Sequence, residues 1–463
     1  MNRLAHRALL ILAVFLGALL PGSAFTQGDG KISGVVADST GAVIPGAAVT
    51  ATQPGTGAKR SVIANEQGEY IFPSLAASGC DLSVTATGFS GYLQKGITLQ
   101  ADAAVTQNVF LKTGSTAETI TVTSDALQVD TTSNTLAQVV NTDSVNEFPL
   151  NGRNAAALTT LVAGVVIAPN QSADQGSQKG FPGVVTISAN GTRANQTNYL
   201  LDGGNNVDEY TNVNAPFPMP DSVQEFSVQT SNYNAEYGQN AGGVVNVITK
   251  SGINKFHGNA FEYVRNAVFN AANYFGYPQP TPTSALQKIR DPLKRNQFDG
   301  TFGGPIIHDN LFFFFGYQKT IIRTASNAAS ASILPTAAQL AGQFTNNVFD
   351  PATCPTTATV TSAAQGCSQF AGNFISPTRF SPVSLALLKY LPTPNSAGSV
   401  LYKKPIQQDF NEFTARVDYT VGPKDRLTVR YFLDKFMQNP VLNLTNLLTY
   451  ADGSTIQYHN SLI

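Results

Sequence analysis

The stretch EYGQNAGGVVNVITKSGINKFHGNAFEYVRN, Glu236–Asn266, marks the point where the sequence changes from one kind of β-structure to another. Two glycines precede an apolar run, Val244–Ile248, which predicts a buried strand. A turn follows at Ser251–Gly252, and a strand rich in aromatic residues begins at Phe256. The stretch therefore predicts that a small globular unit ends here and that a sheet of a different character follows it.

The composition gives no support to nucleic-acid binding or to catalysis. The 463 residues carry a formal net charge of -1, whereas nucleic-acid binding needs a basic surface. The sequence contains no HExxH pair, no GxSxG elbow and no GxxxxGK[ST] phosphate loop. We therefore predict no catalytic, cofactor-binding or metal-binding residues and no enzyme activity.

The N-terminus is typical of a secretory signal peptide. A positively charged start and an apolar run, Ala8–Leu20, are followed by small residues. We predict a signal peptide at residues 1–24, with cleavage between Ala24 and Phe25. A transmembrane anchor is the weaker interpretation, because the run is shorter than the ~20 residues that span a bilayer.

Residues 29–112 alternate short apolar strands with turns, which predicts a β-sandwich. Three of its segments resemble the carboxypeptidase regulatory-like domain, a transthyretin-like sandwich: GVVADSTGAVIPGAAVT (Gly34–Thr50), GEYIFPSL (Gly68–Leu75) and LSVTATGF (Leu82–Phe89). The resemblance implies an accessory domain without catalytic activity. Cys80 stands where that family usually has an aromatic residue, and we expect it to be a buried apolar side chain.

Residues 113–127, TGSTAETITVTSDAL, are small and polar and predict a linker. Within it, five residues resemble the TonB box, the segment that a TonB-type energising protein captures: Glu118, Thr119, Ile120, Thr121 and Val122. An extended strand in a linker can add to a partner's sheet edge through main-chain hydrogen bonds. Two alternatives remain open for this segment: the last strand of the sandwich, or a first strand of the next domain that pairs internally.

Residues 128–253 mix helix and strand patterns. Three segments resemble, in this order, the plug of TonB-dependent outer-membrane receptors: FPLNGRNAAALTTLVAGVV (Phe148–Val166), ISANGTRANQTNYLLDGGNN (Ile187–Asn206) and SVQEFSVQTSNYNAEYG (Ser222–Gly238). The opening stretch, Glu236–Asn266, resembles the junction between plug and barrel in the Oar-like group of these receptors.

Several features of this plug region can be interpreted individually. Asn151 or Asn154 can cap a short helix. The Asp202–Glu209 loop lacks the DxDxDG spacing of a calcium site, so we expect a solvated turn. The resemblance implies that plug charges pair with the barrel wall, although Arg153 and Arg193 can equally be surface residues.

Residues 254–463 show the alternation of a transmembrane barrel. In Phe413–Val421 and again in Arg426–Leu433, apolar residues alternate with polar or charged ones. Apolar-out and polar-in hairpins are typical of outer-membrane barrels, although a soluble sheet with one wet face has the same period. The aromatic cluster Phe312–Phe315 favours the barrel, because aromatic residues form girdles at membrane interfaces.

A long connection from about Arg323 to Gln408 has few strand signals and predicts an extracellular loop. Cys354 and Cys367 flank a short polar segment within it, so they could form a disulfide in an exported chain. No CxxC pair accompanies them, which disfavours zinc.

The sequence as a whole predicts a mainly β fold: an N-terminal β-sandwich, an α+β plug and the first strands of an incomplete antiparallel transmembrane β-barrel. Roughly six barrel strands are recognisable, whereas plugged transporters have about 22. We therefore expect this chain to be the N-terminal part of a longer receptor.

The resemblance implies TonB-dependent uptake of an unidentified substrate across the outer membrane of a Gram-negative-type bacterium, with the sandwich in the periplasm. The implied partners are a TonB-type energising protein, outer-membrane lipid and an extracellular substrate. An alternative is a surface-binding or adhesion protein that is anchored by the barrel and binds through the sandwich and the loops.

Overall fold

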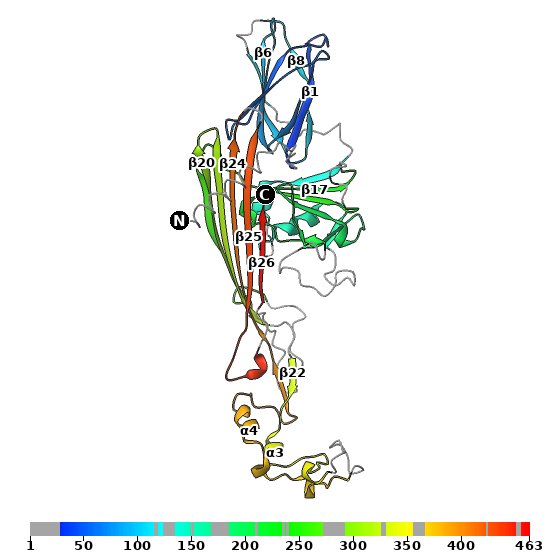
Figure 1. Ribbon diagram of the computed structural model, residues 1–463, viewed down its shortest axis with the longest axis vertical. Coiled ribbons are helices and arrows are strands. Elements are labelled where there is room, and N and C mark those ends of the chain that lie inside the picture. The colour runs from blue at the N-terminus through cyan, green and yellow to red at the C-terminus, as the bar shows by residue number, and fades with distance from the viewer. Residues whose placement is uncertain are drawn as a thin grey trace, which may run out of the picture.

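The computed structural model shows an elongated molecule with three β-rich parts (Figure 1). It describes residues 28–114, 119–123, 135–148, 150, 152–167, 185–208, 212–233, 237, 240–271, 292–325, 330–354, 366–422, 425–450 and 455–463. The signal peptide predicted at residues 1–24, with its cleavage site at Ala24 and Phe25, lies outside the described residues. In Figure 1 the sandwich region occupies one end, and the plug region lies beside the long strands of the barrel region.

The sandwich region consists of two sheets. One contains β1 (Gly30–Asp38), β4 (Glu69–Leu75), β7 (Ala104–Thr106) and β8 (Val109–Leu111). The other has the order β3 (Lys59–Ile63), β2 (Ala48–Thr52), β5 (Ser78–Thr85), β6 (Gly91–Leu99) and β9 (Thr119–Thr123). Alternate apolar side chains from both sheets fill the core between them. Cys80 lies in this core, fully buried and unoxidised, as expected.

The plug region is built on a mixed sheet with the order β10 (Leu136–Val140), β17 (Val223–Ser231), β18 (Val244–Thr249), β13 (Asn198–Leu201) and β14 (Gly204–Asn205). Every residue of β18 is buried, which explains why four of its six residues are apolar valines and isoleucine. Around this sheet lie the helices α2 (Thr142–Glu147), η1 (Ala155–Leu161), η3 (Ala194–Gln196) and η4 (Pro220–Ser222), and the strand pairs β11 (Val165–Ile167) with β12 (Ile187–Ala189) and β15 (Val207–Asp208) with β16 (Val213–Asn214). Asn154 caps η1, where its side chain accepts a hydrogen bond from the Ala156 N–H.

The barrel region is one antiparallel sheet of six strands in sequence order, here called the long sheet: β19 (His257–Asn266), β20 (Lys294–Ile307), β21 (Leu311–Ala325), β24 (Pro405–Thr420), β25 (Arg426–Asn439) and β26 (Thr455–Leu462). Within the described part of the chain this sheet is open, with β19 and β26 as its edges. The predicted fold class, including an incomplete barrel, is therefore confirmed.

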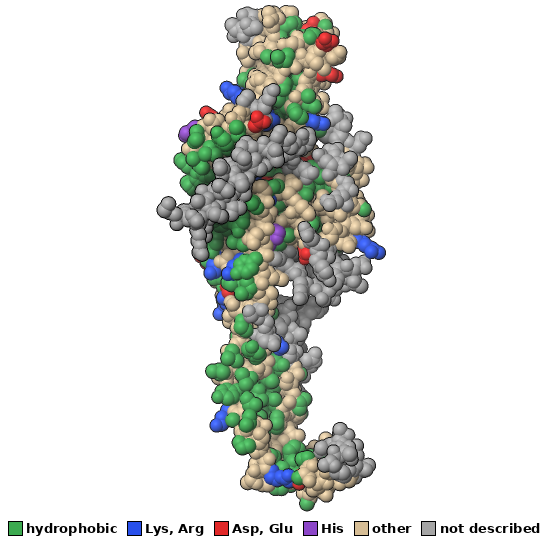
Figure 2. Space-filling view, viewed as in Figure 1, with side chains coloured by type: hydrophobic (Ala, Val, Ile, Leu, Met, Phe, Trp, Pro, Cys, Tyr) green, Lys and Arg blue, Asp and Glu red, His purple; other side chains and the backbone are tan. Residues whose placement is uncertain are grey.

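The two faces of the long sheet differ as the alternation predicts. Val417 and Tyr419 on β24 are 40% and 39% exposed, whereas Arg416 and Asp418 between them are 7% and 4% exposed. Figure 2 shows hydrophobic side chains gathered over the strands of the long sheet. Phe312 and Phe314 correct one expectation: both are 2% exposed on the inner face, because neighbouring residues of a strand point to opposite faces. Only part of the Phe312–Phe315 cluster can therefore contribute to an aromatic girdle.

The long connection between β21 and β24 contains more secondary structure than its sequence suggests. It forms the strand pair β22 (Ser330–Ile333) with β23 (Ser399–Tyr402), and the helices α3 (Ala337–Leu340), η6 (Pro351–Thr353), η8 (Ala371–Asn373), η9 (Pro377–Arg379) and α4 (Pro382–Leu388). A further short helix, η10 (Leu447–Thr449), lies between β25 and β26. A disulfide joins Cys354 and Cys367. In the described residues no helix is long and apolar enough to cross a membrane.

Candidate functional site

A hairpin turn in the plug region directs a carboxylate toward the long sheet. Asp202 and Gly203 connect β13 to β14, and Leu201 pairs with Gly204 across the turn. Both turn residues have positive φ, 50° at Asp202 and 80° at Gly203, which is the type I′ geometry that favours Asp-Gly. The Asp202 carboxylate therefore projects from the end of the plug sheet toward β24 and β25.

Asp202 forms the centre of a buried ionic network that joins the plug region to the long sheet. Arg416 Nη1 and Arg430 Nε donate to its two oxygens at 3.2 and 3.0 Å. The Thr249 N–H donates to the same carboxylate at 2.8 Å. The side chains of Asp202, Arg416 and Arg430 are 7%, 8% and 1% exposed. Removing one partner of such a pair leaves an uncompensated buried charge, which costs about 3–5 kcal/mol.

A second carboxylate, Asp418, extends this network along the inner face of the sheet. Its oxygens accept hydrogen bonds from Arg416 Nε at 2.9 Å and from Arg426 Nη2 at 2.7 Å. Ser251, just beyond β18, donates to Asp418 at 2.8 Å. The plug region is thus held to β24 at two points, by Asp202 with Arg416 and by Ser251 with Asp418.

Arg153 makes a different contact between the same two parts. Its guanidinium lies over the rings of Phe261 and Tyr263 on β19, at 4.3 and 4.4 Å from their centroids. It also forms a buried ion pair with Asp221, which accepts a second hydrogen bond from Asn259 Nδ2 at 2.6 Å. The ionic partner of Arg153 is therefore inside the plug region, while its contact with the barrel region is aromatic.

The turn after β6 joins the sandwich region to the plug region. The Ala101 N–H donates to Glu225 Oε1 at 2.6 Å, and both residues are buried. Asp102 accepts hydrogen bonds from Tyr237 at 2.8 Å and from Asn246 at 3.1 Å. Burial raises the pKa of Glu225 to about 7 from its ordinary value of 4.5. The junction thus contains a carboxyl group that titrates near neutral pH.

The segment predicted as a TonB box lies at the edge of the sandwich region. Glu118 is outside the described residues, and Thr119–Thr123 forms β9. This strand runs parallel to β6, with Thr119 opposite Gly91. β9 is the last strand of its sheet, and most of its side chains are exposed. The structure thus places Thr119, Ile120, Thr121 and Val122 as in the alternative of a final sandwich strand, and the TonB box stays a prediction.

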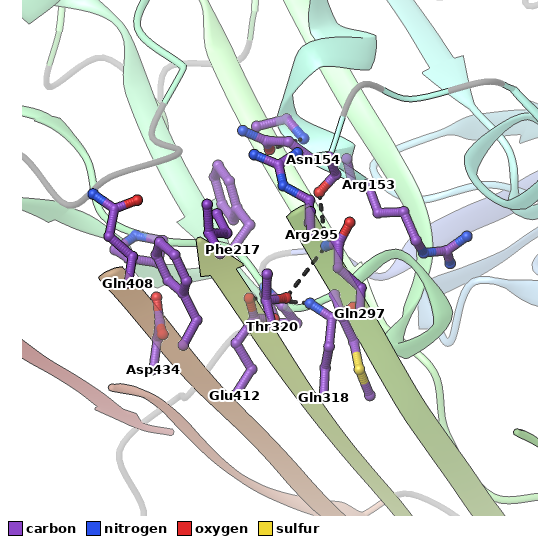
Figure 3. Close-up of a pocket in the computed structure, with 18 of the residues that line it drawn as sticks. Arg153, Asn154, Phe217, Arg295, Gln297, Gln318, Thr320, Gln408, Glu412 and Asp434 are labelled. Atoms are coloured by element: carbon purple, nitrogen blue, oxygen red, sulfur yellow. Dashed lines mark hydrogen bonds between the residues drawn. The ribbon is translucent and has the colours of Figure 1, made fainter. Parts of the chain in front are cut away.

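A cavity of about 280 Å³ lies between the plug region and the inner face of the long sheet. Its plug side consists of residues 152–156 and 216–219 together with Asn214, and its other side consists of inward-facing residues of β20, β21, β24 and β25. Gln297 Nε2 closes one side by donating to the Gly152 carbonyl at 3.0 Å. Figure 3 shows Arg295 and Asn154 at one end of the cavity and Glu412 and Asp434 at the other.

The expectation of a solvated turn at Asp202 is wrong. The carboxylate is enclosed by two arginines because β24 and β25 bring Arg416 and Arg430 to the same place on the inner face. Two inward-facing arginines on adjacent predicted strands were a sign that a carboxylate partner was needed. Arg193, the other arginine considered, lies at the start of η3, where its N–H donates to Gln196 Oε1 at 3.1 Å.

Known families match the two ends of the chain. Residues 31–112 match the carboxypeptidase regulatory-like domain, and residues 248–463 match an outer membrane beta barrel domain. The TonB-dependent transporter Oar of Myxococcus xanthus is 26% identical over 333 residues, which cover 70% of this chain and 29% of Oar. The chain therefore spans less than a third of the length of this curated relative.

Two solved structures illustrate the similarity in fold. A mutant of the ferric enterobactin receptor PfeA of Pseudomonas aeruginosa is 15% identical with a TM-score of 0.36, over 65% of this chain and 33% of PfeA. The outer membrane transporter YddB of Escherichia coli is 13% identical with a TM-score of 0.35, over the same shares of the two chains. The chain thus contains a carboxypeptidase regulatory-like domain followed by an outer membrane beta barrel domain, and in sequence it is similar to the TonB-dependent transporter Oar.

Proposed function

We propose that this chain forms the sandwich, the plug and part of the wall of a transporter that imports a substrate across the outer membrane. The observation that carries the proposal is the buried network of Asp202, Arg416 and Arg430, which attaches the plug region to the polar inner face of the long sheet. A plug of a gated importer must stay in place until it is actively displaced. A buried ionic attachment suits this need, because separating its partners leaves buried charges uncompensated, which costs about 3–5 kcal/mol.

We further propose that a TonB-type protein supplies the displacing force through β9. The exposed position of β9 at a sheet edge supports this, because a partner strand can add to its outer edge by main-chain hydrogen bonds. The strand also leads, through its partner β6, to the turn that contacts Glu225 of the plug region. Force on β9 would therefore reach the junction between the sandwich and plug regions.

A proline substitution within β9 tests this role. Ile120→Pro removes a backbone N–H and should abolish binding of the purified periplasmic domain of the TonB-type protein to the full-length receptor. Ile120→Ala keeps that N–H and serves as the matched control, which should bind like the wild type. Deletion of residues 118–122 should likewise stop uptake and leave substrate binding unchanged. Unimpaired uptake by the deletion variant would refute the TonB box assignment.

The energy dependence of uptake separates transport from adhesion. Import should stop when the proton gradient is collapsed, whereas surface binding by an anchored adhesion protein should continue. Accumulation of substrate that persists without a proton gradient would contradict the transport proposal.

A further inference from the structure

Two acidic side chains face each other inside the cavity, and no described residue forms an ion pair with either of them. Glu412 of β24 and Asp434 of β25 occupy directly opposite positions of the sheet, so their side chains lie on the same face. Asp434 is 4% exposed. Glu412 Oε2 and Asp434 Oδ1 are buried and have no hydrogen-bond partner among the described residues. Like charges at opposite positions destabilise a sheet, and a buried carboxylate without a partner adds to that cost.

A third acceptor continues the same row across the sheet. Gln318 of β21 lies opposite Glu412 and donates to Glu412 Oε1 at 3.4 Å through its amide nitrogen. Its own oxygen, Oε1, is buried and unpartnered in the described part of the chain, and the residue is 4% exposed. Because neighbouring strands are about 4.8 Å apart, the three residues span roughly 10 Å. Gln318, Glu412 and Asp434 are here called the acceptor row.

The charges nearest to the acceptor row do not neutralise it. Arg153 and Arg295 line the opposite end of the cavity (Figure 3). His459, opposite Asp434 on β26, has its Nε2 at 3.2 Å from Asn206 Oδ1. In the acceptor row each atom left without a partner is an oxygen, and two of these oxygens belong to carboxyl groups. A donor that carries a positive charge would satisfy them, because ionised carboxylates only accept hydrogen bonds.

We propose that the acceptor row binds a primary ammonium or guanidinium group of the transported molecule. An organic cation of this kind offers several N–H donors and no acceptor, which matches three acceptors in a row. A metal ion suits the site less well, because in the described residues no group of three or more His, Cys, Asp or Glu could hold one. The inference rests on the proposed transport function and deepens it by naming the chemical class of the substrate.

The position of the row along the strands supports this role. At one end of the long sheet, Asp309 forms hydrogen bonds with Asn254, and the Asn254 N–H donates to the Gly55 carbonyl of the sandwich region. This end of the sheet therefore lies next to the sandwich region. Gln318 lies seven residues beyond Leu311 on β21, about 24 Å along the strand. With the sandwich region in the periplasm, the acceptor row lies well inside the sheet, away from its periplasmic end and toward the side from which a substrate arrives.

Agmatine, a small molecule with one ammonium and one guanidinium group, is the probe for the test. Isothermal titration calorimetry should detect its binding to the purified full-length receptor, and glutarate at the same concentration should not bind at the acceptor row. The double substitution Glu412→Gln/Asp434→Asn should weaken agmatine binding by about ten- to a hundredfold, because it removes charged hydrogen bonds. The same variant should melt no lower than the wild type, since it also removes a like-charge pair.

Asp409→Asn is the matched control, because it removes a β24 carboxylate that pairs with Arg323 and does not line the cavity. Agmatine binding that is absent from the wild type, or that falls equally in Asp409→Asn, would overturn the cation site. Energy-dependent uptake without agmatine binding would overturn the site and leave the transport proposal intact. Agmatine binding without energy-dependent uptake would support the site and contradict transport.

Discussion

Substituting Asp202 by asparagine should loosen the attachment of the plug region to the long sheet. Asparagine tolerates positive φ, and Asn-Gly favours the same type I′ turn, so the hairpin should keep its shape. The change removes the only carboxylate that pairs with Arg430 among the described residues, while Arg416 retains Asp418. The remaining acceptors of Arg430 are uncharged: Ser461, which it contacts at 2.8 Å, and the Leu201 carbonyl.

The expected size of this effect follows from the burial of Arg430. Its side chain is 1% exposed, so its charge has no access to water once the partner is lost. Leaving such a charge uncompensated costs about 3–5 kcal/mol, which corresponds to two to four orders of magnitude in an equilibrium constant. We expect the opening equilibrium of the plug region to increase by that factor.

Hydrogen exchange of the full-length receptor measures this equilibrium. Amides of β13 and β18 should exchange about a hundredfold or more faster in Asp202→Asn, whereas the sandwich strands β1 and β5 should keep their rates. The double variant Asp202→Asn/Arg430→Gln should recover most of the lost protection, because it removes the unpaired charge. A double variant as loose as Asp202→Asn would refute the reasoning, since the cost would then not come from Arg430.

Two further changes test the other junctions of the plug region. Because burial raises the pKa of Glu225 to about 7, the folded protein binds this proton more tightly than the unfolded chain, and stability should fall by about 3 kcal/mol as the pH rises from about 4.5 through 7. Glu225→Gln should remove that slope in urea unfolding at pH 5 and pH 8; an unchanged slope would contradict the assignment. Arg153→Met should lower the urea midpoint of the plug region, because it removes the ion pair to Asp221 and the contact with two aromatic rings. Arg153→Lys should lose less, since it keeps the charge, and equal losses in the two variants would count against the ionic contribution.

Sequence patterns with a fixed local period gave reliable expectations. The alternation in Phe413–Val421 predicted which side chains of β24 are exposed, and the structure confirms it. The apolar run Val244–Ile248 predicted a buried strand, and all of β18 is buried. Expectations from local sequence were less successful where the pairing or contact partner of a residue lies far away in the chain. In the sandwich region, the neighbouring strands β7 and β8 are separate and short, because each pairs with a different part of β1.

The sequence by itself determined the order of the three regions, their β character and the polar and apolar faces of the long strands, because turn residues and a two-residue period are local properties. Tertiary structure alone decided which residues meet. Asp202 and Arg430 are 228 residues apart in the chain, and only the docking of the plug sheet on β25 makes them an ion pair. The acceptor row depends on the register of three strands, and a shift by one residue would turn its side chains to the opposite face. Register is set by pairing across the whole sheet, so it cannot be read from any single strand.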